Sequence, residues 1–181
     1  MKLWLVRHAQ PLITEGLCYG QLDIAADPTA SEQAAKKIAP LLPQQAMLYC
    51  SALQRAQQLA QALHELRHDL ILNVDPRLNE MNFGTWEGIA WDAIPQTAFD
   101  TWLDDFDAHR FGNAQSVRDV LTRTYEALNE CSVHQNVVWV THAGVIRAVN
   151  YLKQFGLSSL ATSDKWPAKA PAFGEHQCLC F

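Results

Sequence analysis

The chain has 181 residues, of which 49% are hydrophobic and 18% are charged, a composition typical of one globular domain with a single core. Its formal net charge of -5 comes from 14 basic and 19 acidic side chains, which argues against a general attraction to nucleic acid or anionic membranes. No apolar run reaches the length of a signal-peptide core or a membrane span. We therefore expect one domain, residues 1–181, located in the cytoplasm, with no nucleic-acid and no membrane partner.

The cysteines are scattered along the chain and include no Cys-x-x-Cys pair. Their odd number argues against a disulfide framework, and their spacing argues against a thiolate zinc site. We therefore expect reduced packing residues at Cys18, Cys50, Cys131, Cys178 and Cys180.

Apolar spacing predicts strands and helices that alternate along the chain. In chain order these are a strand at 3–6, a helix at 28–39, a strand at 47–50, a helix at 53–66, a strand at 70–74, short helices within 91–111, a helix at 117–131, a strand at 137–140, a helix at 145–152 and a last strand at 176–181. Ser51 is the predicted N-cap of the second long helix. The alternation predicts the α/β class, as a three-layer α/β/α sandwich with a central, mostly parallel sheet. The aromatic and acidic stretch at about 89–113 is expected to form a small helical cap over the sheet's edge.

Basic side chains from three segments are predicted to meet at one end of this sheet. Arg7 and His8 directly follow the first strand. Arg55 lies in the first turns of the helix after the second strand, and His142 begins the helix after the strand at 137–140. Ligands of α/β sheets bind outside the carboxyl ends of the strands, where helix N-termini add partial positive charge. We therefore expect an anion site that contains two histidines.

The residue types at this site favour phosphoryl chemistry. Two arginines and two histidines suit a phosphoryl group better than a carboxylate, because guanidinium groups hold several oxygens at once. The sequence has no Walker loop and no evident cluster of metal-binding carboxylates, so we expect neither a metal nor a cofactor. A neutral imidazole can attack phosphorus directly, and nearby positive charge favours the neutral form. Glu80, in the predicted loop at 77–88, is the candidate acid for the leaving alcohol.

The segments that carry these residues resemble, in order and spacing, the signature segments of the histidine phosphatase superfamily, whose fold is phosphoglycerate-mutase-like. They are LVRHA at 5–9, SALQRAQQLA at 51–60, LNEMNFGTWEG at 78–88 and VTHAGVIR at 140–147. The resemblance implies that His8 becomes phosphorylated and that Glu80 acts as general acid and later as base. It also implies that Arg7, Arg55 and His142 hold the phosphoryl oxygens. Within the superfamily, MKLWLVRH and LNEMNFG are most similar to α-ribazole phosphatases of cobalamin biosynthesis.

The sequence departs from the family pattern at several positions near the site. Ala9 stands where the family has glycine, which matters only if that position needs a positive φ. Gln58 replaces a threonine, and Thr14 is the nearest counterpart of a loop asparagine. The usual Gly-Glu-Ser before the helix at 117–131 is Ala114-Gln115-Ser116, which removes a charge near the site entrance. The last two departures bear on substrate preference.

Other polar residues have simpler interpretations. His64-Glu65-Leu66-Arg67-His68 matches the H-E-x-x-H pattern of zinc proteases, but it lies at the far end of its helix and lacks a third ligand. We interpret these histidines as solvated. Glu87 is expected to form a loop salt bridge, and Arg147 is expected to be a solvated or paired helix residue.

The expected activity is that of a histidine acid-type phosphatase, a metal-independent phosphomonoesterase. Its partner would be a small soluble phosphate ester, possible substrates including α-ribazole 5'-phosphate. The alternatives within the fold are a phosphoglycerate mutase and a phosphatase of broad specificity for sugar and organic phosphates. A non-catalytic phospho-ligand binding protein is the alternative from another class. The sequence leaves the oligomeric state open.

Overall fold

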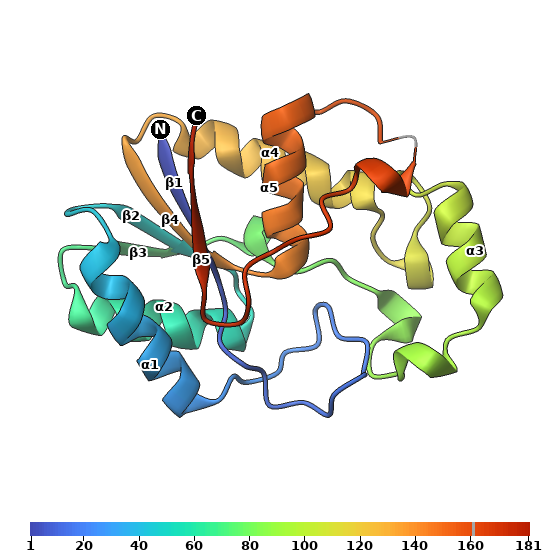
Figure 1. Ribbon diagram of the computed structural model, residues 1–181, viewed down its shortest axis with the longest axis horizontal. Coiled ribbons are helices and arrows are strands. Elements are labelled where there is room, and N and C mark those ends of the chain that lie inside the picture. The colour runs from blue at the N-terminus through green and yellow to red at the C-terminus, as the bar shows by residue number, and fades with distance from the viewer. Residues whose placement is uncertain (161) are drawn as a thin grey trace.

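The strands form one sheet in the order β3-β2-β4-β1-β5 in the computed structural model, which describes residues 1–160 and 162–181 (Figure 1). The strands are β1 (Lys2–Arg7), β2 (Met47–Cys50), β3 (Ile71–Val74), β4 (Asn136–Thr141) and β5 (His176–Cys180). Strands β1 to β4 pair in parallel, and β5 pairs antiparallel with β1. The mostly parallel sheet predicted from the sequence is therefore confirmed.

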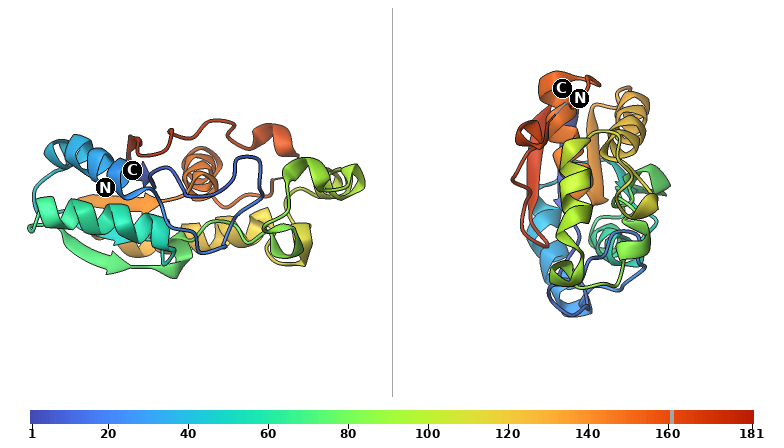
Figure 2. Two further views of the ribbon diagram at one scale, coloured as in Figure 1. Left: turned by 90° about the horizontal axis from the view of Figure 1, so that it is seen from below. Right: turned by 90° about the vertical axis from the view of Figure 1, so that its right-hand side faces the viewer.

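Helices cover both faces of this sheet, which gives the three layers (Figure 2). The helices are α1 (Pro28–Ile38), α2 (Gln54–Leu66), α3 (Gln96–Asp104), α4 (Val117–Cys131) and α5 (Ala143–Phe155). Short 3-10 turns lie at Ala39–Leu41, Pro76–Leu78, Gly84–Trp86, Trp91–Ala93, Phe111–Asn113 and Ser163–Lys165. Helices α1 and α2 pack on one face, and α4 and α5 pack on the other. No helix in the described ranges is long and apolar enough to cross a membrane.

The central strands are apolar because both of their faces are buried. Along β4, Val137 and Trp139 belong to the core under α4 and α5, whereas Val138 and Val140 belong to the core under α1 and α2. This is the two-residue alternation of a strand. All of these side chains are buried. The polar residues of the strand are Asn136 and Thr141 at its two ends, and the site lies at the Thr141 end.

The start of α2 differs from its prediction. The helix begins at Gln54 with Leu53 as N-cap, and Ser51 does not cap it. Instead, the Asp23 carboxylate accepts a hydrogen bond from the Gln54 amide at 2.7 Å. The Ser51 hydroxyl lies 2.7 Å from Nε2 of His142. The serine is therefore engaged with the histidine, while a carboxylate from a distant loop satisfies the helix N-terminus.

The segment that contains α3 lies apart from both edge strands, next to the start of α4 (Figure 1). Its aromatic side chains pack on one another, with the rings of Trp102 and Phe111 stacked at 4.5 Å between centroids. Short helices were predicted here and are present. Their position is beyond the sheet, because the ends of α4 and α5 supply the apolar surface on which they pack.

Candidate active site

The carboxyl ends of three neighbouring strands bring the predicted residues together. The amide of His8 donates to the carbonyl of Thr141 at 3.0 Å, and that of Ser51 donates to the carbonyl of Val140 at 3.1 Å. The hydrogen-bond pattern of the sheet thus continues into the site. As a result, the imidazole rings of His8 and His142 lie 5.0 Å apart between centroids.

His8 is held in one tautomer. Its side chain is 2% exposed, and its Nδ1 lies 2.7 Å from the carbonyl oxygen of Ala9. A carbonyl oxygen only accepts hydrogen bonds, so Nδ1 carries the proton and Nε2 keeps its lone pair. Burial, with the charges of Arg55 and Arg7, lowers the pKa of His8 to about 3. The imidazole is therefore neutral across the physiological pH range.

Ala9 contributes through its main chain. Among the described residues, the non-glycine positions with positive φ are Gln45 and Asn113. Ala9 is not one of them, so its methyl group causes no backbone strain. The side chain is 1% exposed. The replacement of the family's glycine is accommodated, and the functional atom at this position is the carbonyl oxygen.

His142 is fully buried and precedes the first turn of α5. The amide of Leu53 donates to the Ser51 hydroxyl at 3.2 Å, and the hydroxyl lies 2.7 Å from Nε2 of the histidine. Nδ1 has no partner among the described residues. Burial, then the charges of His8 and Arg55, hold the pKa of His142 well below its usual value. Ser51 was not predicted as a site residue, because its sequence position also fits a helix cap.

Arg55 is fully buried on the first turn of α2. Its guanidinium donates to the carbonyl of Gly20 at 2.6 Å and to that of Leu22 at 2.8 Å. Its Nε has no partner in the described residues. Burial lowers the pKa of Arg55, and the nearby Glu80 carboxylate opposes that shift. The arginine therefore holds the loop at 20–22 and retains unused N–H groups.

Arg7 is covered by the segment before β5. Its Nη1 donates to the carbonyl of Pro171 at 3.1 Å, and its guanidinium carbon lies 3.8 Å from the centroid of the Phe173 ring. The same ring lies 5.3 Å from that of His8. This cation–π contact fixes the planar group. Phe173 gave no sequence signal, since it stands alone in a stretch without periodicity.

Glu80 reaches the site from the loop after β3. Its two carboxylate oxygens accept hydrogen bonds from the amides of Gly144 at 3.0 Å and Met81 at 2.9 Å. A Cβ atom at position 144 would lie 2.1 Å from Oε1 of Glu80. Glycine is therefore required at this position for the carboxylate to sit at the N-terminus of α5. The five residues predicted from the sequence are now all placed at one location.

Comparison with known proteins identifies the family of this chain. Residues 3–162 match the family model described as histidine phosphatase superfamily, branch 1. The chain belongs to the histidine phosphatase superfamily. The family and its named members support a phosphatase enzyme.

The names of similar proteins refer to different substrates. The adenosylcobalamin/alpha-ribazole phosphatase of Escherichia coli is 30% identical over 155 residues, covering 81% of this chain and 75% of that protein. The glucosyl-3-phosphoglycerate phosphatase of Mycolicibacterium vanbaalenii is 31% identical over 181 residues, covering 92% of this chain and 77% of that protein. The structure of a mycobacterial glucosyl-3-phosphoglycerate phosphatase with VO3 matches with a TM-score of 0.82 at 25% identity, covering 99% and 90% of the two chains.

A buried arginine that the sequence analysis did not identify supports Glu80 in this phosphatase. Arg123, on α4, donates to the carbonyl of Arg77 at 2.5 Å and to that of Glu80 at 3.1 Å. Burial lowers the pKa of Arg123 to about 10. Gln115, where the family has glutamate, accepts from the amide of Asn82 at 3.0 Å. The neutral glutamine leaves Arg123 with no carboxylate partner within 4.0 Å among the described residues.

Two further residues, Glu87 and Arg147, were predicted to be structural. Glu87 makes no salt bridge in the described ranges; it accepts from the amides of Gln21 at 2.8 Å and Phe83 at 3.0 Å. The predicted salt bridge is wrong, because main-chain N–H groups of the loop take the place of a basic side chain as donors to this carboxylate. Arg147 is half-buried and donates to the carbonyl of Ala168 at 3.3 Å, and no carboxylate in the part of the chain that is described lies within 4.0 Å of its charged group.

The H-E-x-x-H pair is remote from the strand ends. The rings of His64 and His68 lie 5.8 Å apart at the end of α2, and Nδ1 of His64 lies 3.0 Å from the carbonyl oxygen of Leu70. Within residues 1–160 and 162–181, no group of three or more His, Cys, Asp or Glu side chains is placed to hold a metal ion.

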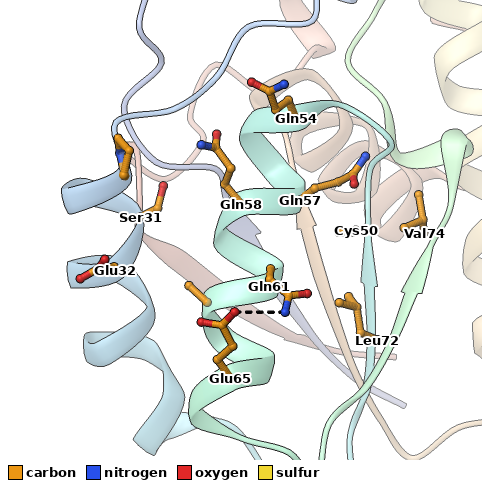
Figure 3. A pocket seen from close by; sticks show the side chains of 12 residues that line it. Ser31, Glu32, Cys50, Gln54, Gln57, Gln58, Gln61, Glu65, Leu72 and Val74 are labelled. Carbon is orange, nitrogen blue, oxygen red and sulfur yellow. Dashed lines mark hydrogen bonds between the residues drawn. The ribbon is translucent and has the colours of Figure 1, made fainter.

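A cavity of about 510 Å³ lies between α1, α2 and the edge of the sheet (Figure 3). Its lining includes four glutamines of α2, namely Gln54, Gln57, Gln58 and Gln61. None of the five clustered residues lines it. It is therefore separate from the candidate active site.

Proposed function

We propose that this protein hydrolyses phosphomonoesters through a phosphohistidine formed on Nε2 of His8. The observation that carries the proposal is the hydrogen bond between Nδ1 of His8 and the Ala9 carbonyl, at 2.7 Å. It leaves the other nitrogen unprotonated in a site where two arginines favour a neutral ring. A nucleophile with that lone pair needs no metal and no separate base.

The remaining basic groups would bind the phosphoryl oxygens. Arg55 has an unpartnered Nε, and Arg7 also has a buried Nε without a partner among the described residues. Nδ1 of His142 is unpartnered too. The Ser51 hydroxyl can donate to Nε2 of His142, which places the proton on Nδ1, where it can bond an oxygen. Preorganised donors of this kind stabilise the charge of the transferred group.

Glu80 would handle the protons of both steps. As the Nε2–phosphorus bond forms, the bond from phosphorus to the ester oxygen breaks, and the leaving oxygen takes a proton from Glu80. A bound phosphate dianion favours the protonated carboxyl needed for this role. In the second step Glu80, now a carboxylate, removes a proton from water. The water oxygen bonds to phosphorus, the nitrogen–phosphorus bond breaks, and inorganic phosphate leaves.

For the substrate, we propose a small soluble phosphate ester, with α-ribazole 5'-phosphate of cobalamin biosynthesis as the first candidate. The name of the relative in Escherichia coli supports this choice. We also propose that residues 1–181 fold as one cytoplasmic domain and that residues 89–113 act as its cap.

The test is turnover by His8→Ala with and without a chelator. Wild type is expected to release phosphate in the presence of the chelator, and His8→Ala is expected to lose activity by more than about 10,000-fold. The exposed His68→Ala serves as matched control and keeps full activity. Rapid acid-free quenching is expected to trap acid-labile, base-stable phosphate on His8.

A panel of esters decides between the related functions. It contains α-ribazole 5'-phosphate, sugar phosphates, nucleotides and phosphoglycerates. Isomerised phosphoglycerate without net phosphate release would show a mutase instead. Binding of esters without any phosphoenzyme would show a phospho-ligand binding protein, and activity surviving in His8→Ala would contradict the proposed mechanism.

A further inference from the structure

A pocket of about 250 Å³ opens beside Glu80, and no residue of α1 or α2 lines it. Glu80 and Gly144 form one end of it, where the leaving oxygen of an ester would lie. The other walls come from the 80–83 loop, α3, α4, α5 and the segment before β5. Its position makes it the site of the ester's alcohol portion, so the inference rests on the proposed function.

The walls of this pocket are apolar, and half of their side chains are aromatic. They are formed by Met81, Phe83, Trp102, Phe106, Val117, Val120, Ala143 and Trp166. Trp102 stacks on Phe111 at 4.5 Å and on Phe106 at 5.3 Å between centroids. Trp166 meets Phe106 edge to face at 6.1 Å. These rings support one another, so the cavity is formed before any ligand arrives.

Two side chains that line the pocket carry a polar atom that is shielded from it. Nε of Arg147 and Nε1 of Trp102 are buried and have no hydrogen-bond partner among the described residues. Both side chains line the pocket. Because these atoms are shielded from solvent, the surface that a ligand would meet is largely apolar.

We infer that the alcohol portion of the substrate carries a flat, largely apolar ring system. A cavity of about 150 Å³ lined by apolar residues holds one benzene ring, so the volume of about 250 Å³ here accommodates roughly two fused rings. Aromatic rings stack favourably against Trp and Phe. A polyhydroxylated alcohol would instead place hydroxyl groups against apolar walls that offer them no partner.

The experiment compares two esters whose leaving alcohols have similar basicity, 2-(naphthalen-2-yl)ethyl phosphate and ethyl phosphate. Matching the alcohols separates ring binding from leaving-group reactivity. Wild type is expected to show a kcat/KM for the naphthyl ester higher on the order of 100-fold, from burial of the ring. A ratio near one, with ethyl phosphate still hydrolysed, overturns the inference and leaves the proposed function intact.

Variants locate the preference in this pocket. Trp166→Ala is expected to reduce the ratio of the two kcat/KM values at least about 10-fold. The matched control is Leu103→Ala, which alters an exposed side chain of α3 outside the pocket and leaves both values unchanged. A ratio that Trp166→Ala leaves unchanged overturns the inference.

Calorimetry with 2-(naphthalen-2-yl)ethanol gives a readout that does not require turnover. Wild type is expected to bind this alcohol, and Trp166→Ala is expected to bind it at least about 10-fold more weakly. If neither ester is hydrolysed, the proposed function fails, yet binding that depends on Trp166 still supports the ring site. Absence of binding overturns it.

Discussion

The strand-end site and the aromatic pocket lie side by side and are built in opposite ways. At the strand ends, His8, Arg55 and Glu80 are each held by hydrogen bonds to main-chain atoms. In the pocket, Trp102 and Trp166 are held by ring contacts and come from α3 and from an irregular segment. A hydrogen bond to the main chain restricts both the distance and the angle at which a side chain is held. Packing between apolar rings tolerates replacement by side chains of other shapes. The chemistry and the selectivity of this protein can therefore vary independently.

The largest effect predicted for this comparison concerns the position of Glu80 in the strand-end site. Gly144→Ala places a methyl group where Oε1 of Glu80 now sits, at 2.1 Å, and so displaces the acid. We expect kcat for alkyl phosphates to fall about 100-fold to about 10,000-fold. Esters of acidic alcohols such as 4-nitrophenol need no proton, so their turnover falls far less. Equal losses for both kinds of ester would contradict the role of Glu80.

The next effect concerns the stability cost of a neutral histidine. The pKa of His8 falls from an ordinary 6.5 to about 3 on folding. Below pH 6.5 the unfolded chain binds a proton that the folded chain binds only near pH 3, so stability decreases as the pH falls through this window. The contribution is about 3 kcal/mol between pH 7 and pH 4.

Urea denaturation at pH 7 and at pH 4 measures this loss of stability. His8→Asn is expected to lose less stability than wild type over the same interval, because it lacks the titrating ring. An identical loss in the two proteins would show that His8 titrates normally.

A smaller effect tests whether Arg123, which does not belong to the five site residues, helps to position Glu80. Arg123→Met removes the donors to the carbonyls of Arg77 and Glu80. We expect kcat for alkyl phosphates to fall about 10-fold to about 100-fold through misplacement of Glu80. Esters of 4-nitrophenol again lose less. A uniform loss, together with a lowered melting temperature, would indicate a purely structural arginine.

The smallest effect concerns Gln58, and it tests whether this residue of α2 belongs to the active site. Gln58, one turn after Arg55, accepts from the amide of Ala26 at 2.6 Å and donates to its carbonyl at 3.4 Å. Gln58→Thr restores the family's residue but loses this tether. We expect a decrease of about 1 kcal/mol in the free energy of unfolding and an unchanged kcat. A change in kcat above about 10-fold would place Gln58 in the site instead.

The difference between the two regions also explains what the sequence predicted. Arg7, His8, Arg55 and His142 follow apolar runs or begin amphipathic helices, so periodicity alone places them at strand ends. Periodicity does not place Phe173, Arg123 or Trp166. These residues reach the site through long-range packing of segments without a repeating pattern.

Ser51 shows a different limit. Its type and position fit a helix cap, and only the tertiary position of His142 decides which partner it takes. The roles of the site residues, the domain boundaries and the cap stay predictions.

The hydrogen bond between His8 and the Ala9 carbonyl determines how substitutions at position 9 affect the nucleophile. The atom that sets the histidine's tautomer belongs to the peptide backbone, so no codon change at position 9 that preserves the local conformation removes it. The tautomer of His8 is therefore independent of the side chain at position 9, provided that the local backbone conformation is kept.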